Sequence, residues 1–321
     1  MKKKKIICMV MAAVCCIGVF SGCSISGKNI RFGAADIGGT YYTFANSFTE
    51  TAGNEESNYT FEVKTTAGSM ANVRLLSENY IQMAVCQADL ANQAYLGTGV
   101  FEDNKKYQGY SAVACLYTEA CQIVVRKDSD IDCLDDLEGK TVSIGAEESG
   151  TEQNAKQILS AAGLGGGIVR MVNLDYTQAA EKLKSGKIDA FFCTAGVGTT
   201  VIEELAKQCD IKLIGIEDKI IGRITEQNEY CEKYTVEAGT YKGVDEDINT
   251  IGVKALLLVN NKLSEKAVYY ITKTLFENSD KIQYSVPVDF DMDIDNALEK
   301  IDIPIHQGAL NYYEEQGKKI N

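Results

Sequence analysis

Small polar residues stand at three places where an apolar strand pattern gives way to a helical pattern. These turns read Gly-Gly-Thr-Tyr-Tyr at residues 38–42, Gly-Ser-Met-Ala-Asn at residues 68–72 and Ser-Gly-Thr at residues 149–151. Where a strand leads into a helix, the first N–H groups lack backbone partners and the helix dipole is positive. Carboxylates and phosphates bind readily at such ends. The turns therefore predict a binding site for a small anion.

The candidate groups in these turns each have a distinct use. A glycine lets a ligand approach the backbone closely, and the hydroxyl groups can donate hydrogen bonds. The candidates are Gly39, Thr40, Tyr41, Ser69, Asn72, Ser149, Gly150 and Thr151. The alternative for each turn is a plain helix cap, in which the hydroxyl serves only the backbone. A nucleotide site is not expected, because the G-x-x-x-x-G-K-[ST] phosphate loop is missing.

The chain offers little material for nucleophilic catalysis or metal binding. His306 is the only histidine, so a Ser-His or Cys-His pair would have to use it, and its place beside Pro304 favours a surface loop. Seven cysteines follow residue 23, an odd number, and none has C-x-x-C spacing. We expect mostly free thiols, no enzymatic activity, no cofactor and no metal.

The elements that must position these turns follow the pattern of an α/β fold with a parallel sheet. Strands are predicted at residues 30–34, 59–65, 82–86, 111–117, 122–126, 141–144, 169–172, 188–193, 212–216 and 251–259. Helices are predicted at 40–52, 69–78, 88–96, 151–162, 177–184, 201–207, 264–278 and 309–315. A length of 321 residues suits two units of about 150 residues, the second beginning near residue 128.

The N-terminus has the pattern of a secretory signal. Four lysines at 2–5 precede an apolar stretch at 6–20, and small residues lead to Cys23. This arrangement resembles a bacterial lipobox, which implies a signal peptide over 1–22, acylation of Cys23 and a tether over 23–29. The alternative is an ordinary signal peptide. The chain would then act outside the cytoplasmic membrane, and its net charge of −13 without a later basic block argues against a nucleic-acid partner.

Nine short motifs, in order, resemble the TAXI solute-binding subunits of TRAP transporters. Besides the three turns, they are Ala-Val-Cys-Gln-Ala-Asp at 84–89, Leu-Tyr-Thr-Glu at 116–119, Val-Val-Arg at 124–126, Asp-Asp-Leu-Glu-Gly-Lys at 135–140, Asp-Ala-Phe-Phe at 189–192 and Ala-Gly-Thr-Tyr at 238–241. Cys86 and Cys193 depart from the small apolar residues usual in that family. The resemblance extends from about residue 30 to residue 317.

The resemblance implies a type II periplasmic-binding fold, in which two α/β lobes close on a ligand cleft. Residues 30–122 and 236–321 would form one lobe and residues 123–235 the other. Gln87 and Thr194 join the candidate site by this resemblance, and Glu119, near the lobe crossing, would hold a ligand ammonium or be a solvated hinge residue.

The implied function is capture of a small carboxylate such as glutamate, glutamine or 2-oxoglutarate. A monomeric lipoprotein on the outer face of the cell membrane would deliver it to a TRAP permease driven by an ion gradient. The alternatives are a binding subunit of an ABC importer and a ligand-binding sensory lipoprotein. An enzyme on this fold and a structural surface lipoprotein are less favoured.

Overall fold

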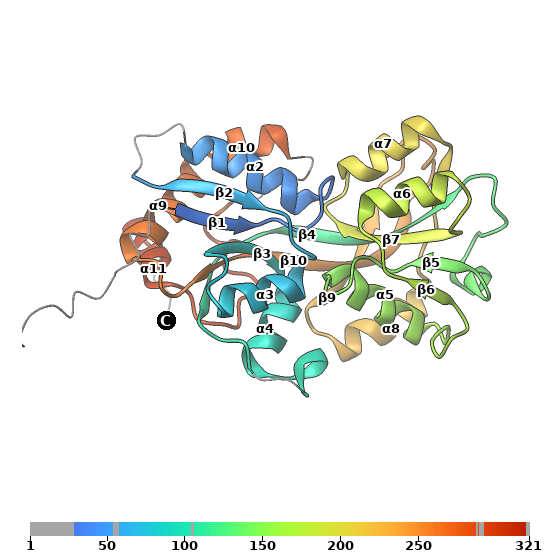
Figure 1. Ribbon diagram of the computed structural model, residues 1–321, viewed down its shortest axis with the longest axis horizontal. Helices are drawn as coiled ribbons and strands as arrows, with labels where there is room; N and C mark the ends of the chain where they lie inside the picture. Colours follow the sequence, from blue (N-terminus) through green and yellow to red (C-terminus); the bar gives the residue numbers. More distant parts are fainter. Residues whose placement is uncertain (1–28, 54–57, 104–105, 287, 289–291, 319–321) are drawn as a thin grey trace, which may run out of the picture.

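The computed structural model describes residues 29–53, 58–103, 106–286, 288 and 292–318. The expected signal peptide and Cys23 lie outside these residues. Two α/β lobes lie side by side along the long axis of the molecule, with strands passing from one to the other (Figure 1). No helix within the described ranges is both long enough and apolar enough to cross a membrane.

Lobe 1 is built on three parallel strands. These are β1 (Asn29–Gly33), β2 (Thr60–Lys64) and β3 (Met83–Gln87), with β1 between the other two. Its helices are α2 (Thr40–Gly53), α3 (Ser69–Ser77), α4 (Ala88–Leu96), α9 (Glu265–Glu277), α10 (Ser279–Ser285) and α11 (Gln307–Glu315), with a 3₁₀ turn η1 (Gly99–Phe101). Helices α2 and α10 lie above the strands in Figure 1, and α3 and α4 lie below them.

Lobe 2 also has three parallel strands, two of them shorter than those of lobe 1. Strand β5 (Thr141–Ser143) pairs in parallel with β6 (Arg170–Val172) and with β7 (Ala190–Ala195). Two further strands, β8 (Ile211–Leu213) and β9 (Cys231–Val236), pair with the strands that cross between the lobes. The helices are α5 (Gly150–Ala161), α6 (Tyr176–Lys184), α7 (Thr200–Gln208) and α8 (Asp218–Gln227), with a 3₁₀ turn η2 (Leu134–Leu137).

Two long strands join the lobes. Strand β4 (Tyr110–Arg126) and strand β10 (Ile248–Asn260) are antiparallel neighbours in one ten-stranded sheet. The prediction of separate strands at 111–117 and 122–126 is wrong, because β4 is continuous. A strand of 17 residues extends roughly 55 Å, enough to run through both lobes.

The return to lobe 1 lies within β10 rather than at residue 236. Val236, Tyr241 and Val244 belong to a buried cluster with the side chains of α6 and α7. Residues 248–253 of β10 still pair with β9, and the strand reaches β3 only from Ala255 onward. The hydrophobic burial of this segment therefore places it in lobe 2.

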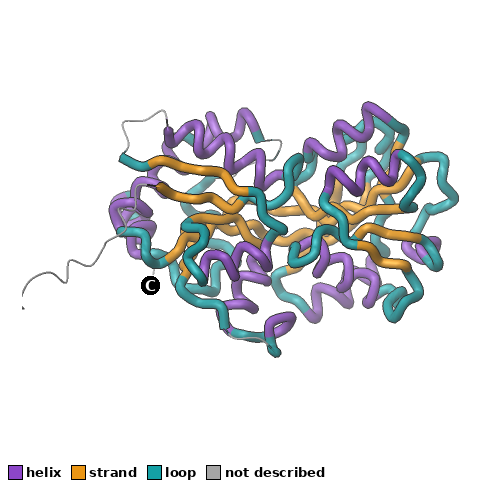
Figure 2. The backbone as a smooth tube through the Cα atoms, in the orientation of Figure 1, coloured by secondary structure: helices purple, strands orange, loops and turns teal. Residues whose placement is uncertain are grey.

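The core lies in four clusters, one on each side of the sheet in each lobe. Figure 2 shows helices against both faces of the central strands, which explains why the strands are apolar on both sides. Strand β3 is buried at every position, and β7 likewise. Because side chains pack against both faces of β3 and β7, these strands hold the turns that follow them in fixed positions.

Three details differ from the sequence-based expectations or extend them. Helix α8 and strand β9 were not predicted. His306 is not a surface loop residue: it is 8% exposed, and its Nδ1 accepts a hydrogen bond from the Gly308 N–H at the start of α11. The seven cysteines in the described part of the chain are all free.

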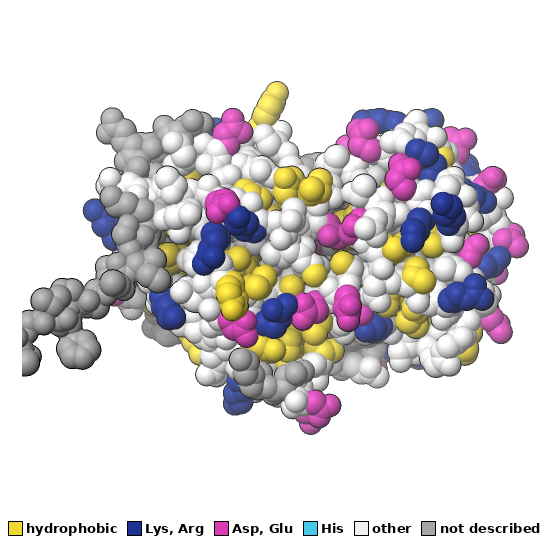
Figure 3. Space-filling model, viewed as in Figure 1, with side chains coloured by type: hydrophobic (Ala, Val, Ile, Leu, Met, Phe, Trp, Pro, Cys, Tyr) yellow, Lys and Arg dark blue, Asp and Glu magenta, His cyan; other side chains and the backbone are white. Residues whose placement is uncertain are grey.

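On the face of the molecule in Figure 3, lysine and arginine side chains are dispersed among aspartate and glutamate side chains.

Candidate functional site

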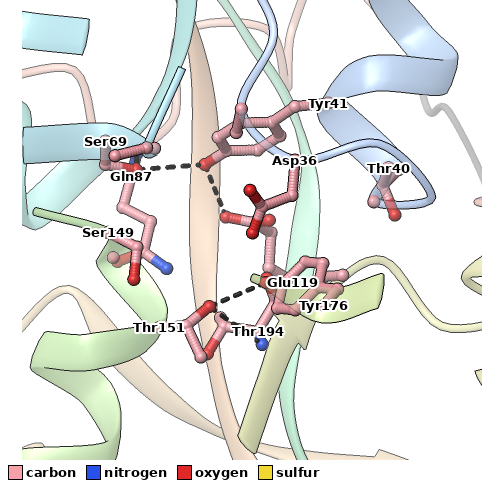
Figure 4. A pocket seen from close by; sticks show the side chains of 16 residues that line it. Asp36, Thr40, Tyr41, Ser69, Gln87, Glu119, Ser149, Thr151, Tyr176 and Thr194 are labelled. Carbon is pink, nitrogen blue, oxygen red and sulfur yellow. Dashed lines mark hydrogen bonds between the residues drawn. The ribbon is translucent and has the colours of Figure 1, made fainter. Parts of the chain in front are cut away.

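A cavity lies where the crossing strand β4 passes between the lobes. Its cavity volume is about 30 Å³, room for one or two water molecules, so the two lobes leave little free space between them. Sixteen residues from both lobes line it: Ala35, Asp36, Gly39, Thr40, Tyr41, Ala67, Gly68, Ser69, Gln87, Glu119, Ser149, Gly150, Thr151, Tyr176, Thr194 and Ala195. Figure 4 shows polar side chains from both lobes facing this space.

Glu119 lies at the centre of β4 and ends a chain of hydrogen bonds. The Tyr41 hydroxyl donates to Glu119 Oε2 at 2.7 Å (Figure 4). The Ser69 Oγ lies 3.5 Å from the same hydroxyl and accepts a bond from the Gln87 N–H at 3.1 Å. Because Tyr41 gives its only proton to Glu119, Ser69 donates to Tyr41. This chain fixes the position of the carboxyl group.

Two carboxyl groups line the cavity, and the pKa of each is raised. Glu119 is 2% exposed, and burial raises its pKa to about 8 although Tyr41 and Gln87 hydrogen-bond to it. Burial raises the pKa of Asp36 to about 7, with a further contribution from the charge of Asp175. No lysine or arginine is among the sixteen lining residues. A positively charged ligand group would therefore find two carboxylates and no competing cation.

Four helices begin at the cavity. Helices α2, α3, α5 and α6 start at Thr40, Ser69, Gly150 and Tyr176, all of which line it. The dipole of each helix is positive at this end, and the first N–H groups have no partner one turn earlier. Ser149 caps α5, because its Oγ accepts from the Glu152 N–H at 3.0 Å. The cavity thus combines an acidic side with several positive helix ends.

The Thr151 hydroxyl belongs to a closed network within lobe 2. Its Oγ1 lies 2.7 Å from the Tyr176 hydroxyl and accepts from the Thr194 N–H at 3.3 Å. Tyr176 donates to the Thr194 carbonyl at 2.9 Å, so Thr151 donates to Tyr176. The hydroxyl proton of Thr151 is therefore used in the hydrogen bond to Tyr176. The group of Thr151 that could donate to a ligand is its backbone N–H.

Other polar groups at the cavity have no partner. Thr40 Oγ1, Gln87 Oε1 and Thr194 Oγ1 are buried without a hydrogen bond. Buried polar groups are nearly always paired, so such a concentration beside one cavity indicates positions that a ligand would satisfy. Gln87 also links the lobes, because its Nε2 donates to Asn154 Oδ1 at 2.9 Å.

Ten of the eleven residues predicted for the site line this one cavity. Asn72 does not: it is fully buried behind α3, where its Oδ1 accepts from Thr66 and its Nδ2 donates to the Val85 carbonyl. The prediction that Asn72 binds the ligand is therefore corrected: its side chain joins α3 to β3 by hydrogen bonds. Sequence reasoning missed Asp36 and Tyr176, although each stands at a strand-to-helix turn of the kind that identified the others.

Replacing Thr40 with valine tests whether an unpaired hydroxyl serves the ligand. A neutral hydrogen bond contributes about 0.5–1.5 kcal/mol, so Thr40→Val should weaken ligand binding about twofold to tenfold. The melting temperature of the unliganded protein should not fall, because the hydroxyl has no partner to lose. Thr151→Val is the matched control and should lower the melting temperature, since it breaks the network with Tyr176. Unchanged affinity in Thr40→Val would remove this hydroxyl from the site.

Several solved structures are similar to this chain in architecture. A putative L-cystine ABC transporter protein from Listeria monocytogenes is 14% identical, with a TM-score of 0.52 over 82% of this chain and 98% of that chain. A ligand-binding component of an ABC-type import system from Staphylococcus aureus is 12% identical, with a TM-score of 0.49 over 90% and 92%. An ancestral arginine-binding protein bound to glutamine is 19% identical, with a TM-score of 0.47 over 81% and 97%.

At 14% identity, the similarity to the Listeria protein shows a shared fold and no shared function. It confirms the expected two-lobed α/β fold of the periplasmic-binding type. A family model described as NMT1-like matches residues 32–317, which include both lobes and every lining residue of the cavity. The chain belongs to the NMT1-like family.

Proposed function

We propose that this chain is the solute-binding subunit of a membrane importer and that its solute is a small amino acid. One observation carries the proposal: the cavity between the lobes joins the carboxyl groups of Glu119 and Asp36 to the positive ends of four helices. An amino acid carries one charge of each sign within a few ångströms. The two halves of the cavity complement these two charges.

The acidic side of the cavity would receive the ammonium group. Glu119 and Asp36 face the same space in Figure 4, and Tyr41 holds Glu119 in place. A hydrogen bond between charged groups is stronger than a neutral one, particularly away from water. Glu119, with a pKa of about 8, is mostly protonated at neutral pH in the unliganded protein, and a bound ammonium group would favour its ionised form.

The ligand carboxylate would bind at the helix ends. Backbone N–H groups at the starts of α3 and α5 are its candidate donors, with the hydroxyl groups of Thr40 and Thr194 beside them. Among the solutes considered for this site, glutamate and glutamine carry the amine that Glu119 would recognise. 2-Oxoglutarate lacks the amine and is therefore less favoured.

We further propose that the partner is a TRAP-type permease of the TAXI class and that acylated Cys23 tethers the protein to the membrane. The ordered motifs of the sequence support the TAXI assignment, and the residues before Cys23 support acylation. The neighbouring genes test the partner: a large multi-span permease supports the proposal, whereas an ATPase gene would indicate an ABC importer.

The solute is identified by a thermal-shift screen of the mature wild-type protein. Amino acids that bind should raise the melting temperature progressively with concentration, because a ligand of the native state stabilises it by mass action. We expect glutamate or glutamine to produce this shift. A screen in which neutral or purely anionic solutes bind and no amino acid does would contradict the proposal.

Binding of an amino acid should depend on pH through Glu119. Its pKa is about 8 in the described structure, so the group must lose a proton to pair with an ammonium. Affinity should rise with pH, by roughly fivefold between pH 7 and pH 8, and should level off near pH 9, where Glu119 is almost fully ionised. Calorimetry across this range measures the effect, and Glu119→Gln, which cannot titrate, should give a flatter profile.

Membrane attachment should depend on the thiol of Cys23. Acylation with more than one chain gives stable anchoring, and a serine at residue 23 has no thiol to acylate. Cys23→Ser should therefore move the protein from the membrane fraction to the soluble fraction of extracytoplasmic material. The two forms should bind the solute equally. A Cys23→Ser protein that stays in the membrane as wild type does would contradict acylation at this residue.

A further inference from the structure

An ion pair crosses between the lobes outside the cavity. Arg74 lies on α3 in lobe 1, and Glu148 precedes α5 in lobe 2. The pair is bidentate, with Arg74 Nε 3.2 Å from Glu148 Oε1 and Nη2 2.6 Å from Oε2. Their side chains are 34% and 44% exposed, and neither residue lines the cavity. The contact therefore joins the lobes without contacting a ligand.

The backbone of Glu148 reinforces this contact. The Glu148 carbonyl accepts a hydrogen bond from the Ala71 N–H in the first turn of α3 at 3.2 Å, again across the lobes. Glu148 has φ of 63°, a left-handed conformation that few residues other than glycine adopt. Its own N–H donates to Glu152 Oε2 at 3.0 Å. Both the side chain and the main chain of Glu148 thus engage α3.

The same residues are joined along the chain to the candidate site. Glu148 directly precedes the turn at residues 149–151, and Arg74 follows Ser69 on the same short helix. A second contact between the lobes lies at the first turn, where the Gly38 carbonyl accepts from Thr199 Oγ1 and from the Val201 N–H, each at 3.1 Å. Bonds between the lobes thus adjoin two of the turns that form the cavity.

We propose that Arg74 and Glu148 form a latch that holds the lobes closed and so sets how long a solute stays bound. The ion pair exists only when the lobes meet, so it adds stability to the closed state alone. Breaking it should shift the population toward open forms and speed dissociation, with little effect on association. The solute part of this inference rests on the proposed function, whereas the effect on lobe closure does not.

The test compares Glu148→Gln with Glu147→Gln in the mature protein. Glu147 is the adjacent, exposed residue and provides the same change of charge. By small-angle X-ray scattering without solute, Glu148→Gln should have a larger radius of gyration than wild type, and Glu147→Gln should match wild type. Salt at 0.5 M should expand wild type toward the value of Glu148→Gln, because salt screens half-exposed ion pairs. The reversed pair Arg74→Glu with Glu148→Arg should restore compactness.

Stopped-flow fluorescence with L-glutamine measures the effect on binding. Glu148→Gln should release glutamine about threefold to tenfold faster than wild type, with an unchanged association rate. Equal radii of gyration in wild type and Glu148→Gln, at low and high salt, would overturn the latch. If the radii differ as expected but glutamine binds neither protein, the latch stands and the assignment of the solute fails.

Discussion

Glu119→Gln should abolish most of the affinity for the amino acid while leaving the protein folded. The variant keeps the size of the side chain and its contact with Tyr41, but removes the negative charge that would pair with an ammonium. Removing one partner of a buried ion pair costs about 3–5 kcal/mol, because the other charge remains unpaired. We therefore expect binding about a hundredfold to several thousandfold weaker by calorimetry.

The unliganded variant provides the internal control. In wild type the pKa of Glu119 is raised from its ordinary value of 4.5 to about 8, so the folded state holds this proton more tightly than the unfolded state. Stability contributed by this group is greatest at low pH and decreases as pH rises toward 8. Glu119→Gln should remove that decrease, and its melting temperature at pH 8 should equal or exceed that of wild type. A variant that binds the amino acid as tightly as wild type would exclude Glu119 as the ammonium partner.

Gly150→Ala should weaken binding by preventing the lobes from closing. A Cβ atom at residue 150 would lie 2.5 Å from Cδ and Oε1 of Gln87, which belongs to the opposite lobe. Gln87 is 2% exposed, and its side-chain Nε2 donates to Asn154 Oδ1, so its side chain has little freedom to move away. Forcing an extra methyl group into a packed site costs about 1–3 kcal/mol, which corresponds to binding about tenfold to a hundredfold weaker.

Gly222→Ala is the matched control for this substitution. Gly222 lies within α8, and no atom is within 4 Å of the position of an added Cβ. Alanine favours a helix interior, so this variant should keep its affinity and gain slightly in stability. Scattering should show Gly150→Ala as more open than wild type with saturating solute. Wild-type affinity in Gly150→Ala would mean that contact between Gln87 and Gly150 is not needed for closure.

The positions of the site turns could be predicted because their signal is local. A strand followed by Gly and Ser or Thr, then a helical pattern, places a helix N-terminus within a residue or two. Helices α2, α3 and α5 begin at or next to the predicted residues. In a two-lobed fold such turns meet at the carboxyl ends of the strands, which explains why Thr40, Ser69 and Gly150 share one cavity.

The continuity of β4 could not be predicted because its polar residues interrupt the apolar pattern. Residues 118–120, Thr-Glu-Ala, look like a loop between two strands, yet they pair with β10 without a break at Glu119. A carboxyl group is tolerated in this buried strand because it faces the cavity and accepts a bond from Tyr41. The polar residues within the apolar pattern thus mark the place where β4 passes the cavity, not the end of a strand.

Asn72 and Asp36 show the limits of spacing as a guide. Asn72 lies one helical turn after Ser69 on the same side of α3. Ser69 lines the cavity, whereas the Asn72 side chain bonds to Thr66 and to the Val85 carbonyl instead. Asp36 stands at a strand-to-helix turn, but its raised pKa depends on burial and on Asp175 from the other lobe. These residues are about 140 positions apart in the chain and come together only when the lobes pack. A local sequence pattern cannot predict such a contact.

Calorimetry of the wild-type protein with glutamate, glutamine and 2-oxoglutarate at pH 8 tests the central claim most directly. Glutamate and 2-oxoglutarate share a carbon skeleton and two carboxylates, and differ in whether an amine or a keto group is present. If Glu119 and Asp36 receive an ammonium, glutamate or glutamine should bind at least about a hundredfold more tightly than 2-oxoglutarate. Binding of 2-oxoglutarate with equal or greater affinity would contradict the account.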